Sequence, residues 1–223
     1  MNSRPRLPPL RAAIVDLDGT MVDTLGDFAE ALNRMLDDLR LPAIERLTIE
    51  RLVGKGSEHL VRSVLSHVGA APQLYPAAWD AYQRHYLNVN GMHSEVYPGV
   101  VEGLTWLSAR GLRLACLTNK PTNFAVPLLS AKGLEGFFSV VFGGDAFERK
   151  KPSPLPLLKT CEALASQPAH TLMIGDSSND AAAARAAGCP VLLVTYGYNH
   201  GEPARSVDAD GFVDSLAELR ELL

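Results

Sequence analysis

The chain has 223 residues, a length that suits one large domain or a core domain with a smaller insert. Hydrophobic residues make up 47% and charged residues 21%, as in ordinary globular proteins, and no apolar run reaches the about 18 residues of a membrane span. The formal net charge of -4 excludes a global basic field, so we expect neither nucleic acid nor a membrane as partner.

The cysteines and the N-terminal residues favour a cytoplasmic protein. Cys116, Cys161 and Cys189 are far apart in sequence and lie in apolar surroundings, as expected of free thiols in a reducing compartment. The first ten residues contain two arginines and three prolines rather than the apolar stretch of a signal peptide. We therefore expect a cytoplasmic location and a monomer or small homo-oligomer.

Five short apolar runs predict buried parallel strands. The runs are Ala12–Leu17, Leu112–Leu117, Ser139–Phe142, Thr171–Ile174 and Val191–Val194. Helical patterns accompany the later runs at Val100–Ala109, Thr122–Lys132, Ala181–Ala187 and Asp214–Leu223, the last with Asp214 as its N-cap. This alternation predicts an α/β fold with a doubly wound, Rossmann-like parallel sheet.

The segment 25–94 interrupts this alternation with helical patterns alone. Apolar residues recur at helical spacing from Leu25 to Leu39, from Leu60 to Val68 and from Trp79 to Tyr86. We therefore expect a catalytic core of residues 1–24 and 95–223, with a small α-helical cap of residues 25–94 inserted after the first strand. A cap that leaves the core beside that strand is placed to fold over a site at the strand end.

The first apolar run leads directly into Asp16-Leu17-Asp18-Gly19-Thr20. Two carboxylates held this close raise each other's pKa unless a cation cancels their charge. Mg²⁺ is the expected cation, because it takes oxygen ligands. We therefore predict a site in which one acid attacks and the other moves protons, the alternative being a plain Asp-Gly turn after a strand.

Polar residues follow the other predicted strands as well, and the carboxyl ends of parallel strands share one edge of a sheet. They are Thr118, Asn119 and Lys120 after the second strand, Lys150 and Lys151 in the loop after the third, Asp176 to Asp180 after the fourth, and Tyr196 to Gly201 after the fifth. Their joint placement predicts one cleft with four carboxylates and a lysine. We favour Lys151 over Lys150 because it directly precedes a Pro-x-Pro element.

Together these motifs resemble the haloacid dehalogenase superfamily of aspartyl-phosphate hydrolases. Its four motifs correspond here to Asp16 to Thr20, Thr118-Asn119, Lys151 to Pro154, and Gly175 to Asp180. The resemblance covers nearly the whole chain, because that family has a small helical cap where residues 25–94 lie. Three longer segments look like those of bacterial phosphoglycolate phosphatases: Thr118 to Thr122, Phe142 to Asp145, and Thr195 to Gly201.

The resemblance implies a role for each motif residue. Asp16 would be the nucleophile that forms an aspartyl-phosphate, and Asp18 the general acid and base. Mg²⁺ would be bound by an Asp16 oxygen, the Asp18 backbone carbonyl, Asp176 and, directly or through water, Asp180. The other implied contacts are hydrogen bonds from Thr118 and Asn119 to the phosphoryl group and to Asp16, charge neutralisation by Lys151, and binding of the phosphate around Leu17, Gly19 and Thr20.

The cap is expected to select the substrate. In the loop Gly54-Lys55-Gly56, Lys55 is a candidate to bind a substrate carboxylate, with His59 a weaker candidate; the alternative is that Lys55 is an ordinary exposed residue. The resemblance implies hydrolysis of a small phosphomonoester, foremost 2-phosphoglycolate to glycolate and phosphate. Four alternatives remain: another phosphometabolite such as a sugar phosphate, a β-phosphoglucomutase-like phosphomutase, a phosphonate hydrolase that uses Lys55 as a Schiff base, and a binding module without catalysis.

Overall fold

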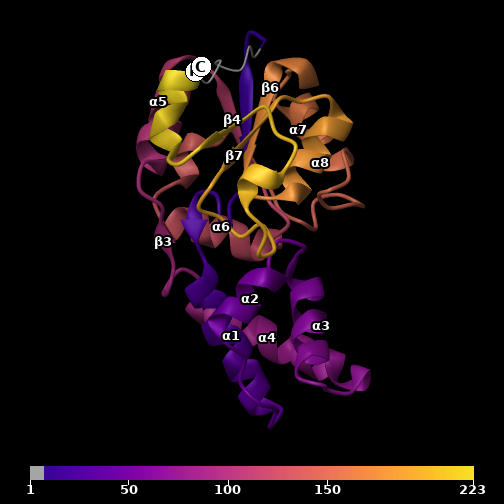
Figure 1. The fold of residues 1–223 in the computed structure, drawn as a ribbon. Coiled ribbons are helices and arrows are strands. Elements are labelled where there is room, and N and C mark those ends of the chain that lie inside the picture. The colour runs from indigo at the N-terminus through magenta and orange to yellow at the C-terminus, as the bar shows by residue number, and fades with distance from the viewer. Residues whose placement is uncertain (1–7) are drawn as a thin grey trace.

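A parallel sheet of six strands, in the order β5-β4-β1-β6-β7-β8, forms the centre of the molecule (Figure 1). The computed structural model describes residues 8–223, so most of the N-terminal residues that argue against a signal peptide lie outside it. The strands are Ala12–Val15 (β1), Arg113–Leu117 (β4), Val140–Phe142 (β5), Thr171–Gly175 (β6), Val191–Val194 (β7) and Gly211–Val213 (β8). Ile14 in β1 is paired with Ala115 in β4 and with Met173 in β6.

Helices cover both faces of the sheet, because the strands point alternate side chains into two apolar clusters. Ala13 and Val15 pack with α5, α6 and the C-terminal helical turns, whereas Ala12 and Ile14 pack with α7 and α8. These helices are Val100–Ala109 (α5), Thr122–Ala131 (α6), Leu155–Ala163 (α7), Ser178–Ala187 (α8) and Leu219–Leu222 (α9), with 3₁₀ turns at Glu135–Phe137, Pro168–His170, Ala204–Ser206 and Leu216–Glu218. The predicted doubly wound α/β fold is confirmed.

Residues 25–94, here called the helical insert, form a helical body beyond one end of the sheet (Figure 1). Its helices are Leu25–Asp38 (α1), Arg46–Leu52 (α2), Ser57–His67 (α3) and Tyr75–Val89 (α4), with a 3₁₀ turn at Pro72–Leu74. They share a buried apolar cluster that includes Leu32, Tyr82 and Tyr86. The chain enters the insert through β2 (Val22–Asp23) and leaves it through β3 (Glu95–Val96), and these two strands pair antiparallel.

Several elements differ from the sequence expectations, among them β2 and β3, which none of the predicted strands covers. Strand β8 was not expected, because Gly211–Val213 holds only two apolar residues, and prolines such as Pro156 obscure the helical period of α7. The helix expected at Asp214–Leu223 is confirmed only in part: Ser215, rather than Asp214, caps a 3₁₀ turn over Leu216–Glu218, and α9 follows that turn directly. The Asp214 carboxylate instead accepts a hydrogen bond from Thr195. Within the described part of the chain, no helix is both long and apolar enough to cross a membrane.

Candidate active site

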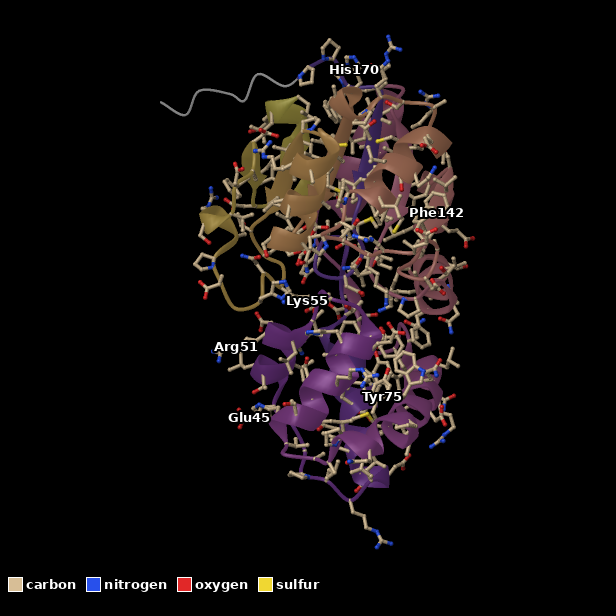
Figure 2. All side chains as sticks on the ribbon, turned by 90° about the vertical axis from the view of Figure 1, so that its right-hand side faces the viewer. Glu45, Arg51, Lys55, Tyr75, Phe142 and His170 are labelled. Carbon is tan, nitrogen blue, oxygen red and sulfur yellow. The ribbon has the colours of Figure 1, made fainter. Side chains whose placement is uncertain are left out.

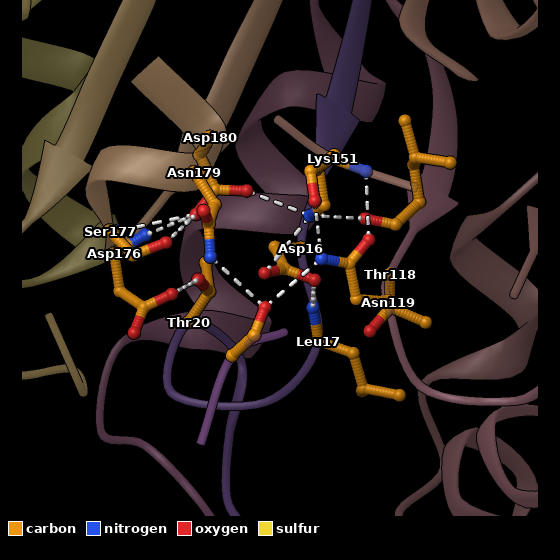
Figure 3. A network of polar contacts seen from close by, with 12 residues as sticks. Asp16, Leu17, Thr20, Thr118, Asn119, Lys151, Asp176, Ser177, Asn179 and Asp180 are labelled. Atoms are coloured by element: carbon orange, nitrogen blue, oxygen red, sulfur yellow. Dashed lines mark hydrogen bonds and ion pairs between the residues drawn. The ribbon is translucent and has the colours of Figure 1, made fainter. Parts of the chain in front are cut away.

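Three carboxylates meet at the carboxyl edge of the sheet (Figure 3). Asp16 directly follows β1, Asp176 directly follows β6, and Asp180 lies in the first turn of α8. One carboxylate oxygen from each lies within 4.8 Å of the other two. Asp180 is fixed by the capping box of α8, in which its carboxylate accepts from the Ser177 N–H at 3.2 Å, and the Ser177 hydroxyl also donates to it at 2.8 Å. Carboxylate oxygens at this spacing fit a divalent cation such as Mg²⁺.

A buried lysine lies between two of these acids. Lys151 Nζ is 3.0 Å from Asp16 Oδ2 and 2.7 Å from Asp180 Oδ1, and its side chain is 2% exposed. The neighbouring Lys150 pairs with Glu58 nearer the surface. The fold therefore brings Lys151, rather than Lys150, to the acids.

Burial makes this cluster electrostatically costly. Burial and the nearby Asp180 carboxylate raise the pKa of Asp16 to about 7, although Lys151 opposes that shift. Burial and the same carboxylates raise the pKa of Asp176 well above its usual range. Burial also acts against the charge of Lys151, but the carboxylates of Asp16 and Asp180 outweigh it and raise the pKa of the lysine. Additional positive charge would therefore stabilise the ionised acids.

Asp18 has a lysine of its own. Lys120 Nζ lies 2.9 Å from Asp18 Oδ1, and the lysine side chain is 1% exposed. The ammonium group also contacts the Tyr86 hydroxyl and lies 4.6 Å from the ring centres of Phe28 and Tyr86, which belong to α1 and α4. The site thus holds four carboxylates and two buried lysines, and one divalent cation would balance the charge. The sequence predicted that Lys120 lies at this edge but assigned it no role.

The polar residues after β4 contact the protein backbone. Asn119 Nδ2 donates to the backbone carbonyls of Gly54 at 3.0 Å and of Lys151 at 2.9 Å, and Asn119 Oδ1 accepts from the Lys151 N–H at 3.0 Å. The Thr118 hydroxyl accepts from the Lys120 N–H at 3.2 Å. In this structure the Asn119 amide is therefore occupied by backbone groups, and not by Asp16 as the resemblance implied.

The turn after β1 supports the acid cluster. The Leu17 N–H donates to Asp16 Oδ1 at 2.7 Å, and the Thr20 hydroxyl donates to Asp176 Oδ1 at 3.1 Å. Gly19 has a φ of +79°, and a Cβ atom there would lie 2.4 Å from Asp176 Oδ2. Only glycine combines this backbone conformation with such a close approach.

The loop between α2 and α3 reaches the acids, and part of it encloses a cavity. Gly54 and Gly56 line this cavity together with Asp16, Asp18 and other core residues, and its volume is ≈ 30 Å³. At about 15 Å³ for each water molecule, it has room for about two. Lys55 and His59 are exposed and, among the described residues, lie outside this lining; Figure 2 shows Lys55 near the junction of the insert and the core.

The segment after β7 joins the acids to the insert. The Tyr198 N–H donates to Asp176 Oδ2 at 2.7 Å. The Tyr198 hydroxyl accepts from the N–H groups of Thr24 at 2.9 Å and Leu25 at 3.2 Å, and it contacts the Asp23 carboxylate. The sequence placed this segment at the same edge of the sheet but did not predict its contact with the insert, because a contact over 174 residues leaves no periodic signal.

Comparisons with known proteins agree with the site. The family model described as haloacid dehalogenase-like hydrolase matches residues 13–194. The chain is 46% identical over 213 residues to a phosphoglycolate phosphatase of Thiobacillus denitrificans, covering 94% of each chain. It is 47% identical over 219 residues to one of Cupriavidus necator, covering 96% of this chain and 94% of the relative.

A solved structure gives the same result. The crystal structure of a predicted phosphoglycolate phosphatase from Haemophilus somnus matches with a TM-score of 0.90 at 32% identity, covering 96% of this chain and 97% of that one. The chain therefore belongs to the haloacid dehalogenase-like hydrolase family and is an enzyme. Within that family it resembles the phosphoglycolate phosphatases, as its motifs predicted.

Proposed function

We propose that this enzyme is a Mg²⁺-dependent phosphoric monoester hydrolase that converts 2-phosphoglycolate to glycolate and phosphate. The observation that carries the proposal is the buried contact of Lys151 with both Asp16 and Asp180, beside Asp176. This arrangement supplies a nucleophilic carboxylate, a cation next to it and oxygen ligands for a metal ion. The choice of substrate is supported by the names of relatives that match nearly the whole chain.

Asp16 is the nucleophile in this proposal. Its carboxylate oxygen attacks phosphorus, the bond from phosphorus to the ester oxygen breaks, and an aspartyl-phosphate forms. Lys151, 3.0 Å from the Asp16 carboxylate, offsets the negative charge of the transferring group. Asp16, Asp176, Asp180 and the backbone carbonyl of Asp18 would hold Mg²⁺, which supplies positive charge at the phosphoryl oxygens and lowers the pKa of Asp16.

Asp18 moves the protons. As an acid it protonates the alkoxide oxygen of the departing glycolate. As a base it then takes a proton from the water that attacks the aspartyl-phosphate, which frees phosphate and restores Asp16. Asn119 has a positioning role, because its amide connects the backbone of Lys151 to the loop carbonyl of Gly54.

The helical insert acts as a cap over a core of residues 1–24 and 95–223. The enclosed cavity of ≈ 30 Å³ has no room for a phosphate ester, so substrate enters when the insert has moved away from the core. Closing of the insert over the bound substrate then excludes bulk water from the reacting groups.

Phosphate release from a panel of phosphorylated metabolites tests this function. We expect 2-phosphoglycolate to give the highest kcat/KM, and EDTA to abolish release. Asp16→Asn should abolish turnover and leave the far-UV circular dichroism spectrum unchanged, because the fold is retained while the nucleophile is lost. Steady phosphate release by that variant would contradict the proposal, and a requirement for a sugar bisphosphate without net phosphate release would favour a phosphomutase.

A further inference from the structure

The second buried lysine, Lys120, is not used by the chemistry described above. Lys151 already provides a cation to the nucleophile Asp16, whereas Lys120 pairs with Asp18 at 2.9 Å. In the proposed reaction Asp18 protonates the leaving oxygen, so Lys120 lies on the side of the site where the alcohol part of the ester departs. The two lysines therefore serve opposite ends of the scissile bond.

The ammonium group of Lys120 has one hydrogen-bond donor to spare. An ammonium carries three N–H donors. In the part of the chain that the structure describes, its hydrogen-bond partners are Asp18 and the Tyr86 hydroxyl. Lys120 also lines the same cavity as Asp16 and Asp18. A buried cation with a free donor beside the leaving group is suited to an anionic group on the substrate.

The surroundings of Lys120 limit the number of charges that the substrate can carry there. The lysine lies against the rings of Phe28 and Tyr86, and Phe28, Val53 and Leu60 of the insert line the cavity. Within residues 8–223, Lys120 is the only cation in this lining, whose other polar groups include Ser57, Thr118 and Asn119. A single carboxylate on the substrate can pair with this ammonium group, whereas the aromatic rings beside it offer no hydrogen-bond partner to the hydroxyls of a sugar.

We propose that Lys120 binds the carboxylate of the substrate and thereby selects small phosphate esters whose alcohol part carries a carboxylate next to the ester carbon. This inference rests on the proposed phosphatase function and assigns its substrate specificity to one residue. Phe28 and Tyr86 belong to the insert, so the binding group is complete only when the insert is closed on the core. Lys120, rather than the exposed Lys55, then recognises the carboxylate.

The test compares two substrates that differ only in the carboxylate. Rates of phosphate release from 2-phosphoglycolate and from ethyl phosphate are measured for the wild type, for Lys120→Met and for Lys159→Met. Lys159→Met is the control, because it also removes one positive charge but at an exposed position of α7. We expect Lys120→Met to lower the ratio of the two kcat/KM values by about 10- to 100-fold, as for a lost charge-assisted hydrogen bond. Using the ratio cancels any effect of the variant on Asp18, because that effect is common to both substrates.

An unchanged ratio in Lys120→Met would overturn the inference, whether or not both rates fall. If the ratio of the two kcat/KM values falls in Lys55→Met and not in Lys120→Met, the insert loop recognises the carboxylate, and this result would equally overturn the inference. If Lys120→Met does not fold, Lys120→Gln takes its place, because it retains a donor without the charge.

Equilibrium binding gives a second readout that needs no turnover. Titration calorimetry with Mg²⁺ present compares 3-phosphonopropionate with propylphosphonate, which lacks the carboxylate. The wild type should bind 3-phosphonopropionate at least about tenfold more tightly, and equal affinities would overturn the inference. Absence of phosphate release from every ester by the wild type would instead end the proposed function, so the two failures are distinguishable.

Discussion

Asp16 lies beside Lys151, whose ammonium group also pairs with Asp180. The Asp16 carboxyl is buried there, and burial raises its pKa from 3.8 to about 7. Between these pH values the folded protein binds more protons than the unfolded chain. The contribution of Asp16 to the free energy of unfolding therefore falls as the pH rises from about 4 to about 7.

This dependence predicts the behaviour of Asp16→Asn in metal-free protein. The variant lacks the titrating group, so its Tm minus that of the wild type should increase between about pH 4 and about pH 8, by the equivalent of about 4 kcal/mol or roughly 8–16 °C. Scanning calorimetry in EDTA measures the difference. Asp80→Asn, an exposed acid on α4, is the control, and a difference independent of pH would show that Asp16 does not carry this penalty.

Tyr198 shows how one side chain connects elements that are distant in sequence. Its backbone N–H donates a hydrogen bond to the Asp176 carboxylate after β6, and its hydroxyl accepts hydrogen bonds from the backbone N–H groups of Thr24 and Leu25 at the start of α1. Removal of the hydroxyl leaves two buried N–H groups without that acceptor. We expect Tyr198→Phe to cost about 2 kcal/mol and to lower Tm by roughly 4–8 °C.

The matched control is Tyr75→Phe. The Tyr75 ring stacks on Trp79, and its hydroxyl has no hydrogen-bond partner among residues 8–223, so its loss should change Tm by less than about 1 °C. Thermal melts followed by circular dichroism compare the variants. Equal Tm values for the two variants would show that the Tyr198 hydroxyl does not stabilise the start of α1.

Local patterns predict elements where packing follows the strand or helix period. The run Val191–Val194 forms β7 with the expected bounds, because all four residues are buried between the two helical layers. Val100–Ala109 forms α5, because its buried apolar residues all pack into one cluster. The sequence predicted no role for Lys120, because its surroundings include Phe28 and Tyr86, which come from a distant part of the chain. The proximity of the Cys161 and Cys189 sulfur atoms, at 3.9 Å, was likewise not predictable from sequence spacing.

At the scale of the whole molecule, the proposed Mg²⁺ site in the acid cluster would make folding and metal binding dependent on each other. A ligand that binds only the folded state stabilises it by about 2.7 kcal/mol at one hundred times its Kd. We expect saturating MgCl₂ to raise Tm by roughly 5–10 °C relative to EDTA, and Asp176→Asn to remove most of that shift. NaCl at matched ionic strength is the control, and a wild-type Tm that is the same in MgCl₂ and EDTA would count against the metal site.

The antiparallel pair of β2 and β3 places the two connections of the helical insert side by side. An inserted module of almost any length can be spliced between adjacent ends without disturbing the register of the strands behind them. The insert can therefore be replaced while the acids at the edge of the sheet keep their positions. A replacement that lacked the rings of Phe28 and Tyr86 would remove the contacts that the insert makes with Lys120 of the core.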